Sequence, residues 1–546
     1  MTEKIKGILS IVLLLIINGS VNAQTEKNNL VIIKTLDSVL KKYNDNSPGV
    51  AVNIVKDGKQ VYNKAFGMAD LERGSYLSTE SVFEVASVSK QFTATAILLL
   101  VAEGKLSLED DVHTYVPRLP DYGKPIKIKH LLTHTSGLRD WRNVTYLTEY
   151  VNYTREYNQG DALNIICRQE KLNFESGYKY SYSNSNYDLL AAVVEKVTGE
   201  TFASFATKRL LEPVGMTNTQ WRNDYRDVIK NRALSYIGKK GSYKLLSPLD
   251  NTNGAAGLLS TPTDLQKWNM FWRNNGFGDT VAKLRLQQGI LNNGRQISYA
   301  MGGVNVIDRN GIKLITHGGL LTAYRTLTSY YPELDLSITY CANTRDIIAP
   351  GLVSDILAIY RPRGAKSKSN FLAMSADEMN KKIGVYKNTE AQNVFSIEMR
   401  KDTAALRFKN GGTLKALSKD TLISDDEVFT FVDKGIEVAD EDGFVLYKPV
   451  QSYQPAVKEL NSFTGKYYSR EADAEIVIEV KDGKLRYSRN GYEWLSLTPS
   501  FQDGNIKGFS TIDNGLFALF EFGKTNKKEI IVSVPRALNI TFREKK

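Results

Sequence analysis

A serine and a lysine stand three residues apart at Ser87 and Lys90, where an irregular segment gives way to the apolar run of FEVASVSKQFTATAILLL. On a helix, residues three apart share a face, with Cβ atoms about 5–6 Å apart. A hydroxyl at the helix start lies beside free backbone N–H groups that can hold an oxyanion. A buried lysine has a lowered pKa and can take the hydroxyl proton. The pair predicts a serine nucleophile with its own proton acceptor.

The spacing alone is not specific, because short motifs also arise by chance. The same Ser-x-x-Lys occurs at Ser38 and Lys41 on a predicted helix. There we expect both side chains to lie on a solvated face. An interpretation of Ser87 and Lys90 as catalytic therefore depends on further polar groups elsewhere in the chain.

A tyrosine and an asparagine supply such a group in the segment YKYSYSNSNYDLL. Tyr182 and Asn184 lie in a polar loop just before a predicted helix over residues 187–197. A tyrosine beside the Ser/Lys pair can relay a proton to a leaving group, and a side-chain amide can orient a substrate carbonyl. Tyr-x-Asn recurs at Tyr150 and Tyr386 without a following apolar helix. We expect only the copy at Tyr182 to be functional.

A third group is His317, Gly318 and Gly319, which end the strand-like run GIKLITHGGL. Glycines at a strand edge let a substrate backbone approach closely. A polar side chain just before them can complete the proton network or contact a substrate carboxylate. Taken with Ser-x-x-Lys and Tyr-x-Asn, this group predicts the site of a serine hydrolase.

The segment that precedes Ser87 is predicted to contain a helix followed by a hairpin. Apolar residues recur at helical spacing from residue 28 to about 44. Alternating residues then flank Asp57 and Gly58, a pair that is typical of a two-residue hairpin turn. A helix followed by a hairpin indicates an α+β domain.

Helical patterns dominate residues 87–232, with Gly104 and Gly199 placed as C-terminal stops. Strand-like runs return at 311–316 and 336–341, and a helical pattern closes the region at residue 360. We expect a sheet whose outer strands come from the two ends of this region and whose middle is helical.

The chain divides further along its length. The polar, basic segment 361–370 (RPRGAKSKSN) predicts a linker after a catalytic domain over 24–360. Beyond it, short alternating strands separated by Asp, Gly and Asn repeat with a period of about 80 residues. We predict two small β modules, at 371–452 and 458–546.

The first 23 residues predict a cleaved signal peptide rather than part of a core. Lys4 and Lys6 precede the apolar run Ile8–Ile17, and residues 18–23 (NGSVNA) have the small-residue spacing of a cleavage site. A run of ten residues is too short to span a bilayer, and we expect no transmembrane segment elsewhere. The chain is expected to be exported in a bacterium, to the periplasm or the medium.

The net charge indicates which classes of partner the chain can bind, and the cysteines indicate whether a disulfide is expected. The formal net charge of +11 is spread along the chain, which favours solubility or weak attraction to a cell-envelope polymer rather than nucleic-acid binding. Two cysteines far apart in the chain, Cys167 and Cys341, do not form a disulfide scaffold. Two buried free thiols are the simpler interpretation, with pairing left open. Nothing in the sequence indicates the oligomeric state.

At this point the chain resembles the serine hydrolases of the class C β-lactamase, DD-peptidase and D-aminopeptidase type. The resemblance covers roughly residues 28–360 and includes IKHLLTHTSGL at 128–138 and NGAAGLLSTPTDLQKW at 253–268. It implies an α+β fold of the β-lactamase/transpeptidase type: an antiparallel sheet with helices and a helical subdomain, here followed by all-β, barrel-like modules. Related members carry C-terminal β-barrel domains.

The resemblance also implies roles for single residues. Ser87 corresponds to the acylated nucleophile, Lys90 to its proton partner and Tyr182 to the general base and acid. Asn184 corresponds to the amide that orients the substrate, and the oxyanion hole to the backbone N–H groups of Ser87 and Leu320.

The departures from the family pattern lie around the third motif. His317 stands where class C β-lactamases usually have lysine, a substitution that resembles peptidase and esterase members, and Leu320 and Leu321 follow the glycines where small residues are frequent. The implied substrates are amides or esters, foremost D-amino-acid-containing peptides, or β-lactams. No cofactor is implied.

A zinc site is one rival interpretation. His130 and His134 have an i, i+4 spacing, but HLLTH lacks the glutamate and the third ligand of a zinc protease, so no metal is expected. An esterase of the same fold, or a non-catalytic penicillin-binding or sensor protein of the cell envelope, is the alternative, since fold alone does not determine function.

Overall fold

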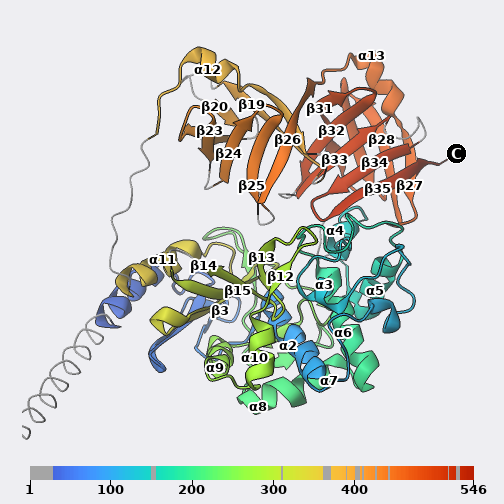
Figure 1. The fold of residues 1–546 in the computed structure, drawn as a ribbon. Helices are drawn as coiled ribbons and strands as arrows, with labels where there is room; N and C mark the ends of the chain where they lie inside the picture. The colour runs from blue at the N-terminus through green and yellow to red at the C-terminus, as the bar shows by residue number, and fades with distance from the viewer. Residues whose placement is uncertain are drawn as a thin grey trace, which may run out of the picture.

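The structure is a computed structural model, and it describes residues 29–148, 155–308, 311–347, 349–360 and 371–545, with short gaps in the last range at 389, 391, 400–405, 409–410, 425–426, 441–442, 514–515 and 524–528. The predicted signal peptide (1–23) and linker (361–370) lie outside the described residues. Figure 1 shows the α/β region below two sheet-rich units. None of the described helices is long and apolar enough to cross a membrane.

An eight-stranded antiparallel sheet is the centre of the first region, in the order β12-β13-β14-β15-β16-β17-β1-β2. The turn between β1 and β2 places Asp57 and Gly58 at φ values of 52° and 71°, the left-handed conformation that a two-residue hairpin turn needs. The predicted hairpin is confirmed. The strands are β1 (Val50–Lys56), β2 (Lys59–Phe66), β12 (Gln288–Ile290), β13 (Gln296–Ala300), β14 (Val304–Asp308), β15 (Lys313–Leu321), β16 (Tyr324–Tyr331) and β17 (Leu336–Ala342).

The predicted origin of the outer strands is only half right. β2 lies at one edge, but the last strand, β17, lies inside the sheet between β16 and β1, and the other edge is β12. Every residue of β17 is buried. A strand without an exposed face suits the centre of a sheet covered on both sides, whereas an edge strand tolerates exposed polar positions.

Helices cover both faces of this sheet. Val50, Val52 and Ile54 of β1 pack on one side against the helix at residues 29–40 and against α11 (Ala349–Tyr360). The opposite side carries α9 (Pro262–Arg273). The alternation of side chains along β1 thus divides the sheet between two apolar cores.

The helical region follows the predicted pattern. α2 (Ser89–Ala102) is buried along nearly its whole length, as expected of a helix at the centre of a core. Gly199 ends α6 and Gly104 follows α2, both at positive φ (73° and 68°), so the predicted helix stops are confirmed. The other helices are α3 (Ile128–Leu132), α4 (Trp141–Thr145), α5 (Gln159–Cys167), α6 (Asn184–Thr198), α7 (Phe202–Ala206), α8 (Glu212–Val214) and α10 (Asp279–Arg285).

Short strands support the helical region. β5 (Phe83–Glu84) and β7 (Gln220–Trp221) flank β11 (Leu258–Ser260) in a small antiparallel sheet, and β6 (Tyr157–Asn158) pairs with β10 (Asp250–Asn251). In the first of these sheets, β5 ends at Glu84, three residues before Ser87, so the sheet supports the predicted nucleophile.

The C-terminal region consists of antiparallel strands, β18–β26 and then β27–β35. In each set the first strand pairs with the last. The described strands together form one continuous sheet and not the closed barrel that the prediction of barrel-like modules implies. The bounds of the first set are β18 (Gly384–Asn388), β19 (Asn393–Met399), β20 (Leu406–Phe408), β21 (Gly411–Thr413), β22 (Lys415–Ala416), β23 (Thr421–Ser424), β24 (Glu427–Val432), β25 (Gly435–Asp440) and β26 (Gly443–Ser452). Those of the second are β27 (Gly465–Ser469), β28 (Ala474–Lys481), β29 (Lys484–Arg489), β30 (Trp494–Ser496), β31 (Thr498–Asp503), β32 (Ile506–Asp513), β33 (Leu516–Phe522), β34 (Glu529–Val534) and β35 (Ala537–Glu544). Two short helices, α12 (Ala376–Asn380) and α13 (Val457–Leu460), precede them.

The second set of strands is docked on the segment around α4 (Figure 1). Arg139 is fully buried there, forms an ion pair with Glu471 and donates to the carbonyl of Leu538 at 3.0 Å. Arg489 donates to the carbonyl of Tyr146 at 2.6 Å. Because buried charges and donors persist only when partnered, these contacts fix the position of the second set of strands on the first region.

Candidate active site

Ser87 lies on a one-turn helix, Ala86–Val88, immediately before α2. The residue before it, Ala86, has a φ of 51°, a conformation that costs free energy for any residue with a Cβ atom. The turn leaves Ser87 half-buried, lining a cavity. A serine on a strained turn at the edge of a cavity is placed to attack a bound carbonyl.

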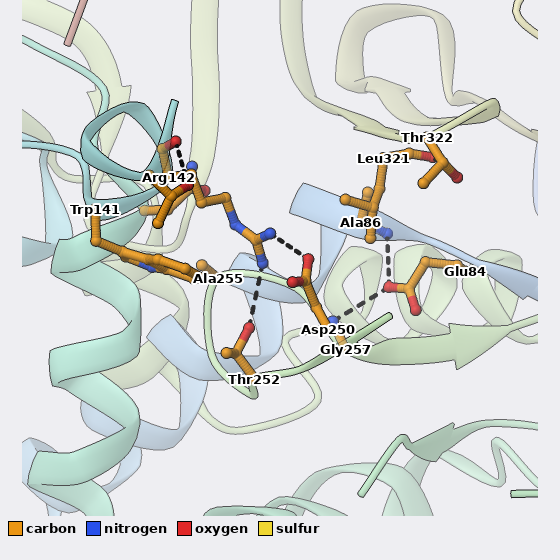
Figure 2. A network of polar contacts seen from close by, with 12 residues as sticks. Glu84, Ala86, Trp141, Arg142, Asp250, Thr252, Ala255, Gly257, Leu321 and Thr322 are labelled. Atoms are coloured by element: carbon orange, nitrogen blue, oxygen red, sulfur yellow. Dashed lines mark hydrogen bonds and ion pairs between the residues drawn. The ribbon is translucent and has the colours of Figure 1, made fainter. Parts of the chain in front are cut away.

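Glu84 holds this turn in place. Its fully buried carboxylate accepts the N–H groups of Ala86 at 3.4 Å and Gly257 at 3.2 Å, as Figure 2 shows, and it pairs with the buried Arg222 at 3.1 Å. One carboxylate thereby connects the nucleophile turn to the segment that precedes β11. Because the pair is buried, loss of either partner leaves an uncompensated charge.

Lys90 contacts Ser87, the predicted nucleophile, from the buried side. The side chain is fully buried, and its Nζ atom donates to Ser87 Oγ at 3.2 Å, to Asn184 Oδ1 at 2.9 Å and to the carbonyl of Ala255 at 2.8 Å. Three acceptors determine its position, and one of them is the predicted nucleophile. The predicted Ser/Lys pair is therefore a real contact in the structure.

The charge state of Lys90 follows from its burial. Desolvation lowers the pKa of Lys90 to about 7, while the carboxylates of Asp188 and Asp140 act in the opposite direction. Burial raises the pKa of Asp188 to about 6. A lysine with a pKa near 7 is unprotonated in a large fraction of molecules at neutral pH, so it can accept the Ser87 proton.

Asn184 is held from the opposite side by a residue that the sequence analysis missed. Asp140 Oδ2 accepts both the backbone N–H and the side-chain Nδ2 of Asn184, each at 2.8 Å. The amide oxygen of Asn184 is thereby directed at Lys90. Asp140 also caps α4, accepting the N–H of Arg142 at 2.9 Å. An aspartate at a helix start was the available signal, but nothing local connects it with Asn184.

Tyr182 lies across the same cluster. Its ring centroid is 4.8 Å from Lys90 Nζ and 4.2 Å from the ring of His134. Burial raises the pKa of Tyr182, whereas the Ser87 hydroxyl and the Arg536 guanidinium lower it. The Tyr182 hydroxyl is buried, and no group of the described residues forms a hydrogen bond of good geometry with it. A protonated phenol beside Ser87 and Lys90 is suited to relaying a proton rather than to acting as a phenolate base.

His317 is neutral and its ring orientation is determined by two contacts. Nδ1 lies 2.7 Å from the carbonyl of Gly318, so Nδ1 carries the proton and Nε2 accepts from the Tyr299 hydroxyl at 3.1 Å. Burial lowers the pKa of His317 to about 3, and Lys90 acts in the same direction. His317 lines the cavity, and its contact with substrate stays a prediction.

The two glycines bring β15 close to the turn that carries Ser87. A Cβ atom on Gly319 would lie 2.1 Å from the carbonyl oxygen of Val85, so no larger residue fits there without moving the turn. Gly318 lines the cavity, and the side chain of Leu320 is 62% exposed at its rim. The oxyanion hole formed by the N–H groups of Ser87 and Leu320 stays a prediction.

The cavity has a volume of about 650 Å³, in the usual range for a small-molecule or peptide site. Seven of the eight predicted site residues line it, and Lys90 lies directly behind Ser87. The structure thus brings together all three motifs. The predicted residues on the wall are Ser87, Tyr182, Asn184, His317, Gly318, Gly319 and Leu320.

A charged network that the sequence analysis missed forms one side of the cavity. Figure 2 shows Arg142 directed at Asp250, with which it forms an ion pair, and at Thr252, whose hydroxyl accepts at 3.2 Å. The Arg142 guanidinium also lies 4.7 Å from the ring of Trp141. The segments joined here are far apart in sequence, so no local pattern predicts the network.

The residues weighed as metal ligands and as a disulfide have other environments. Among the described residues, no three His, Cys, Asp or Glu side chains gather to hold a metal ion. His130 Nδ1 accepts the N–H of Lys127, and His134 Nδ1 accepts the N–H of Ser183, both at 3.2 Å. Cys167 and Cys341 are both free, the first half-buried and the second buried.

A serine nucleophile with a buried lysine partner, between an antiparallel sheet and a helical region, defines a serine hydrolase of the penicillin-recognising class. The chain belongs to the beta-lactamase family, whose pattern matches residues 36–355. Members of this family are serine hydrolases, so the predicted family, fold class and enzyme class are confirmed.

Named relatives agree with this assignment. Protein flp of Staphylococcus aureus (strain MRSA252) is 28% identical over 321 residues, which cover 57% of this chain and 62% of that protein. Penicillin-binding protein 4* of Bacillus subtilis (strain 168) is 30% identical over 304 residues, which cover 53% of this chain and 66% of that protein. The matched part thus spans less than two thirds of either relative.

Solved structures share the fold at lower identity. The octameric penicillin-binding protein homologue from Pyrococcus abyssi has a TM-score of 0.54 at 19% identity, and the match covers 95% of this chain and 99% of that one. The D-amino acid amidase from Ochrobactrum anthropi SV3, complexed with L-phenylalanine amide, has a TM-score of 0.51 at 19% identity, over 61% and 98%. At such identity the likeness concerns the fold alone.

Proposed function

We propose that this chain hydrolyses amide or ester bonds in D-amino-acid-containing peptides through an acyl-enzyme formed on Ser87. The observation that carries the proposal is the contact between Lys90 Nζ and Ser87 Oγ at 3.2 Å, on a lysine whose pKa is lowered to about 7. A nucleophile and a base at that separation can react without rearrangement.

In the acylation step, unprotonated Lys90 accepts the proton of Ser87 as its Oγ atom attacks the substrate carbonyl carbon. The carbonyl oxygen becomes an oxyanion, which the N–H groups of Ser87 and Leu320 stabilise. The bond to the leaving group then breaks. Tyr182 gives its phenol proton to the leaving nitrogen or oxygen and recovers a proton from Lys90, so the acyl-enzyme forms with Lys90 unprotonated again.

In the deacylation step, a water molecule attacks the same carbonyl carbon. Its proton passes through Tyr182 to Lys90, and the Ser87 Oγ atom leaves and takes that proton back. The sequence of transfers returns every group to its starting state. Asn184, held by Asp140 and Lys90, keeps the lysine directed at Ser87 in both steps.

β-Lactams are the second candidate substrates, and the family match is what favours them. The same attack opens the four-membered ring, and the ring nitrogen remains attached to the acyl group. A penicillin therefore serves as a probe whether it is turned over or only acylates Ser87.

The test is intact mass after incubation with a penicillin, a D-Ala-D-Ala peptide or an activated ester. The proposal predicts a mass increase that maps to Ser87 and that decays with release of product when the probe is the D-Ala-D-Ala peptide. If none of the three adds mass and none is consumed, the proposed hydrolase activity is wrong. A stable penicillin adduct without turnover of any probe would favour the sensor alternative.

Export belongs to the same proposal. Residues 1–23 have the pattern of a signal peptide, and peptides with D-amino acids are found in the bacterial cell envelope, outside the cytoplasm. Expression in a bacterium followed by N-terminal sequencing of the periplasmic fraction tests this, with Gln24 as the expected first residue. Recovery of uncleaved chain from the cytoplasm alone would contradict it.

A further inference from the structure

The turn between β34 and β35 of the C-terminal region reaches the catalytic cavity. Pro535 and Arg536 form this turn, and Arg536 lines the same cavity as Ser87. Its guanidinium carbon lies 4.9 Å from the centroid of the Tyr182 ring. A residue from the last strands of the chain therefore faces the group that we assign to protonating the leaving atom.

The turn is held by the catalytic region rather than by its own strands alone. The carbonyl of Arg536 accepts from the N–H of Asp140 at 2.8 Å and from Asn173 Nδ2 at 3.0 Å. The N–H of Leu538 donates to Asn173 Oδ1 at 2.8 Å. Asp140 also orients Asn184, so the backbone of the turn is attached to a residue that positions the catalytic cluster.

The charge of the cavity is unbalanced. Four arginines line its described wall, against one acidic residue, Asp250. Arg142 is neutralised by Asp250, and Arg325 donates to the carbonyls of Thr322 and Tyr324. The guanidinium carbon of Arg155 lies 5.2 Å from the centroid of the Tyr157 ring. No carboxylate of the described residues forms an ion pair with Arg536, whose guanidinium faces the Tyr182 ring. A cation at a cavity wall without an anionic partner is suited to binding an anion from a ligand.

We propose that Arg536 is a substrate-binding residue that binds a carboxylate on the leaving group of the substrate, so that the C-terminal region selects peptides with a free carboxyl terminus. The position over Tyr182 places the guanidinium on the leaving-group side of the scissile bond. A planar guanidinium can hold a carboxylate with two parallel hydrogen bonds. This inference rests on the proposed function, because it assumes that Ser87 is acylated.

The experiment compares two peptides that differ only at the carboxyl terminus, an acyl-D-Ala-D-Ala and its C-terminal amide. With the full chain, kcat/KM is expected to favour the free acid. Arg536→Gln should reduce that preference about 10- to 100-fold, as the loss of a charge-assisted pair predicts. Arg536→Lys should retain part of it, since lysine keeps the charge without the planar geometry.

Arg543→Gln is the matched control. Arg543 lies on β35 and pairs with Glu529 at the surface, so the substitution removes the same charge from the same strands, away from the cavity. It should leave the preference unchanged. Circular dichroism and acylation by an uncharged activated ester establish that each variant is folded and that Ser87 is reactive.

The outcomes separate the two proposals. If the full chain is not acylated by any probe, the proposed function fails, and with it this inference. If the full chain hydrolyses both peptides equally well, or if Arg536→Gln slows both by the same factor, the proposed function stands and carboxylate binding by Arg536 is wrong.

Discussion

The Nζ atom of Lys90 lies 3.2 Å from the Oγ atom of Ser87. The two residues belong to successive helices, Ser87 to the one-turn helix and Lys90 to α2. The change of helix type between them brings the hydroxyl to the cavity wall while the lysine stays buried beneath it. The pair therefore combines access for the substrate with desolvation of the base.

Ser87→Ala is expected to abolish acylation and turnover, with a loss on the order of 10⁶ in rate. Only a half-buried hydroxyl is removed, so the melting temperature should change little. Intact mass with an activated ester measures the effect. Ser38→Ala is the control, because Ser38, on the helix at residues 29–40, and Lys41, in the turn just after it, are both exposed. Their predicted solvated position is confirmed. Turnover by a clean Ser87→Ala preparation would rule out this nucleophile.

The rate of acylation should rise with pH through about 7. Burial lowers the pKa of Lys90 to about that value, so the unprotonated form that accepts the serine proton predominates above it and is lost below it. The measurement is kcat/KM for an uncharged ester between pH 5.5 and 9. Lys90→Arg should remove the activity over the whole range, because arginine does not lose its proton.

Asp188→Asn should move this limb of the pH profile to lower pH. The Asp188 carboxylate raises the pKa of Lys90, so its removal makes the lysine easier to deprotonate. The same pH series measures the shift. A limb that stays in place in Asp188→Asn would mean that a group other than Lys90 titrates near pH 7.

Tyr182→Phe is expected to slow acylation, deacylation or both by about 10²- to 10⁴-fold, the usual contribution of proton transfer. The free energy of unfolding should be nearly unchanged, because the Tyr182 hydroxyl makes no good hydrogen bond within the described residues. Single-turnover kinetics and chemical denaturation together check both parts. Wild-type rates at every pH would show that another group carries the proton.

Glu84→Gln should destabilise the protein by about 3–5 kcal/mol, because it leaves the buried Arg222 without its partner. The turn at Ala86 should also lose part of its support, so acylation of Ser87 should slow even where the variant is folded. Urea unfolding measures the first effect. The double variant Glu84→Gln, Arg222→Met should recover much of the lost stability. A double variant no more stable than Glu84→Gln alone would contradict a buried-charge origin.

Local chemistry made much of this protein predictable from its sequence. The hairpin at Asp57 and Gly58 and the helix stops at Gly104 and Gly199 follow from backbone conformations that those residue types favour. Ser87 and Lys90 were recognisable as a pair because three residues on a helix correspond to a fixed separation. For such features, the information lies within a few neighbouring residues.

Tertiary structure alone decided what surrounds the pair. Asp140 and Asn184 are joined by a hydrogen bond across 44 positions of the chain. Arg536, close to the C-terminal end of the chain, lines the same cavity. The lowered pKa of Lys90 is a consequence of burial by segments that no local pattern connects with it. Charge state, orientation and specificity depend on which distant surfaces pack together, because desolvation and hydrogen-bond geometry are properties of the assembled interior and not of any short stretch of sequence.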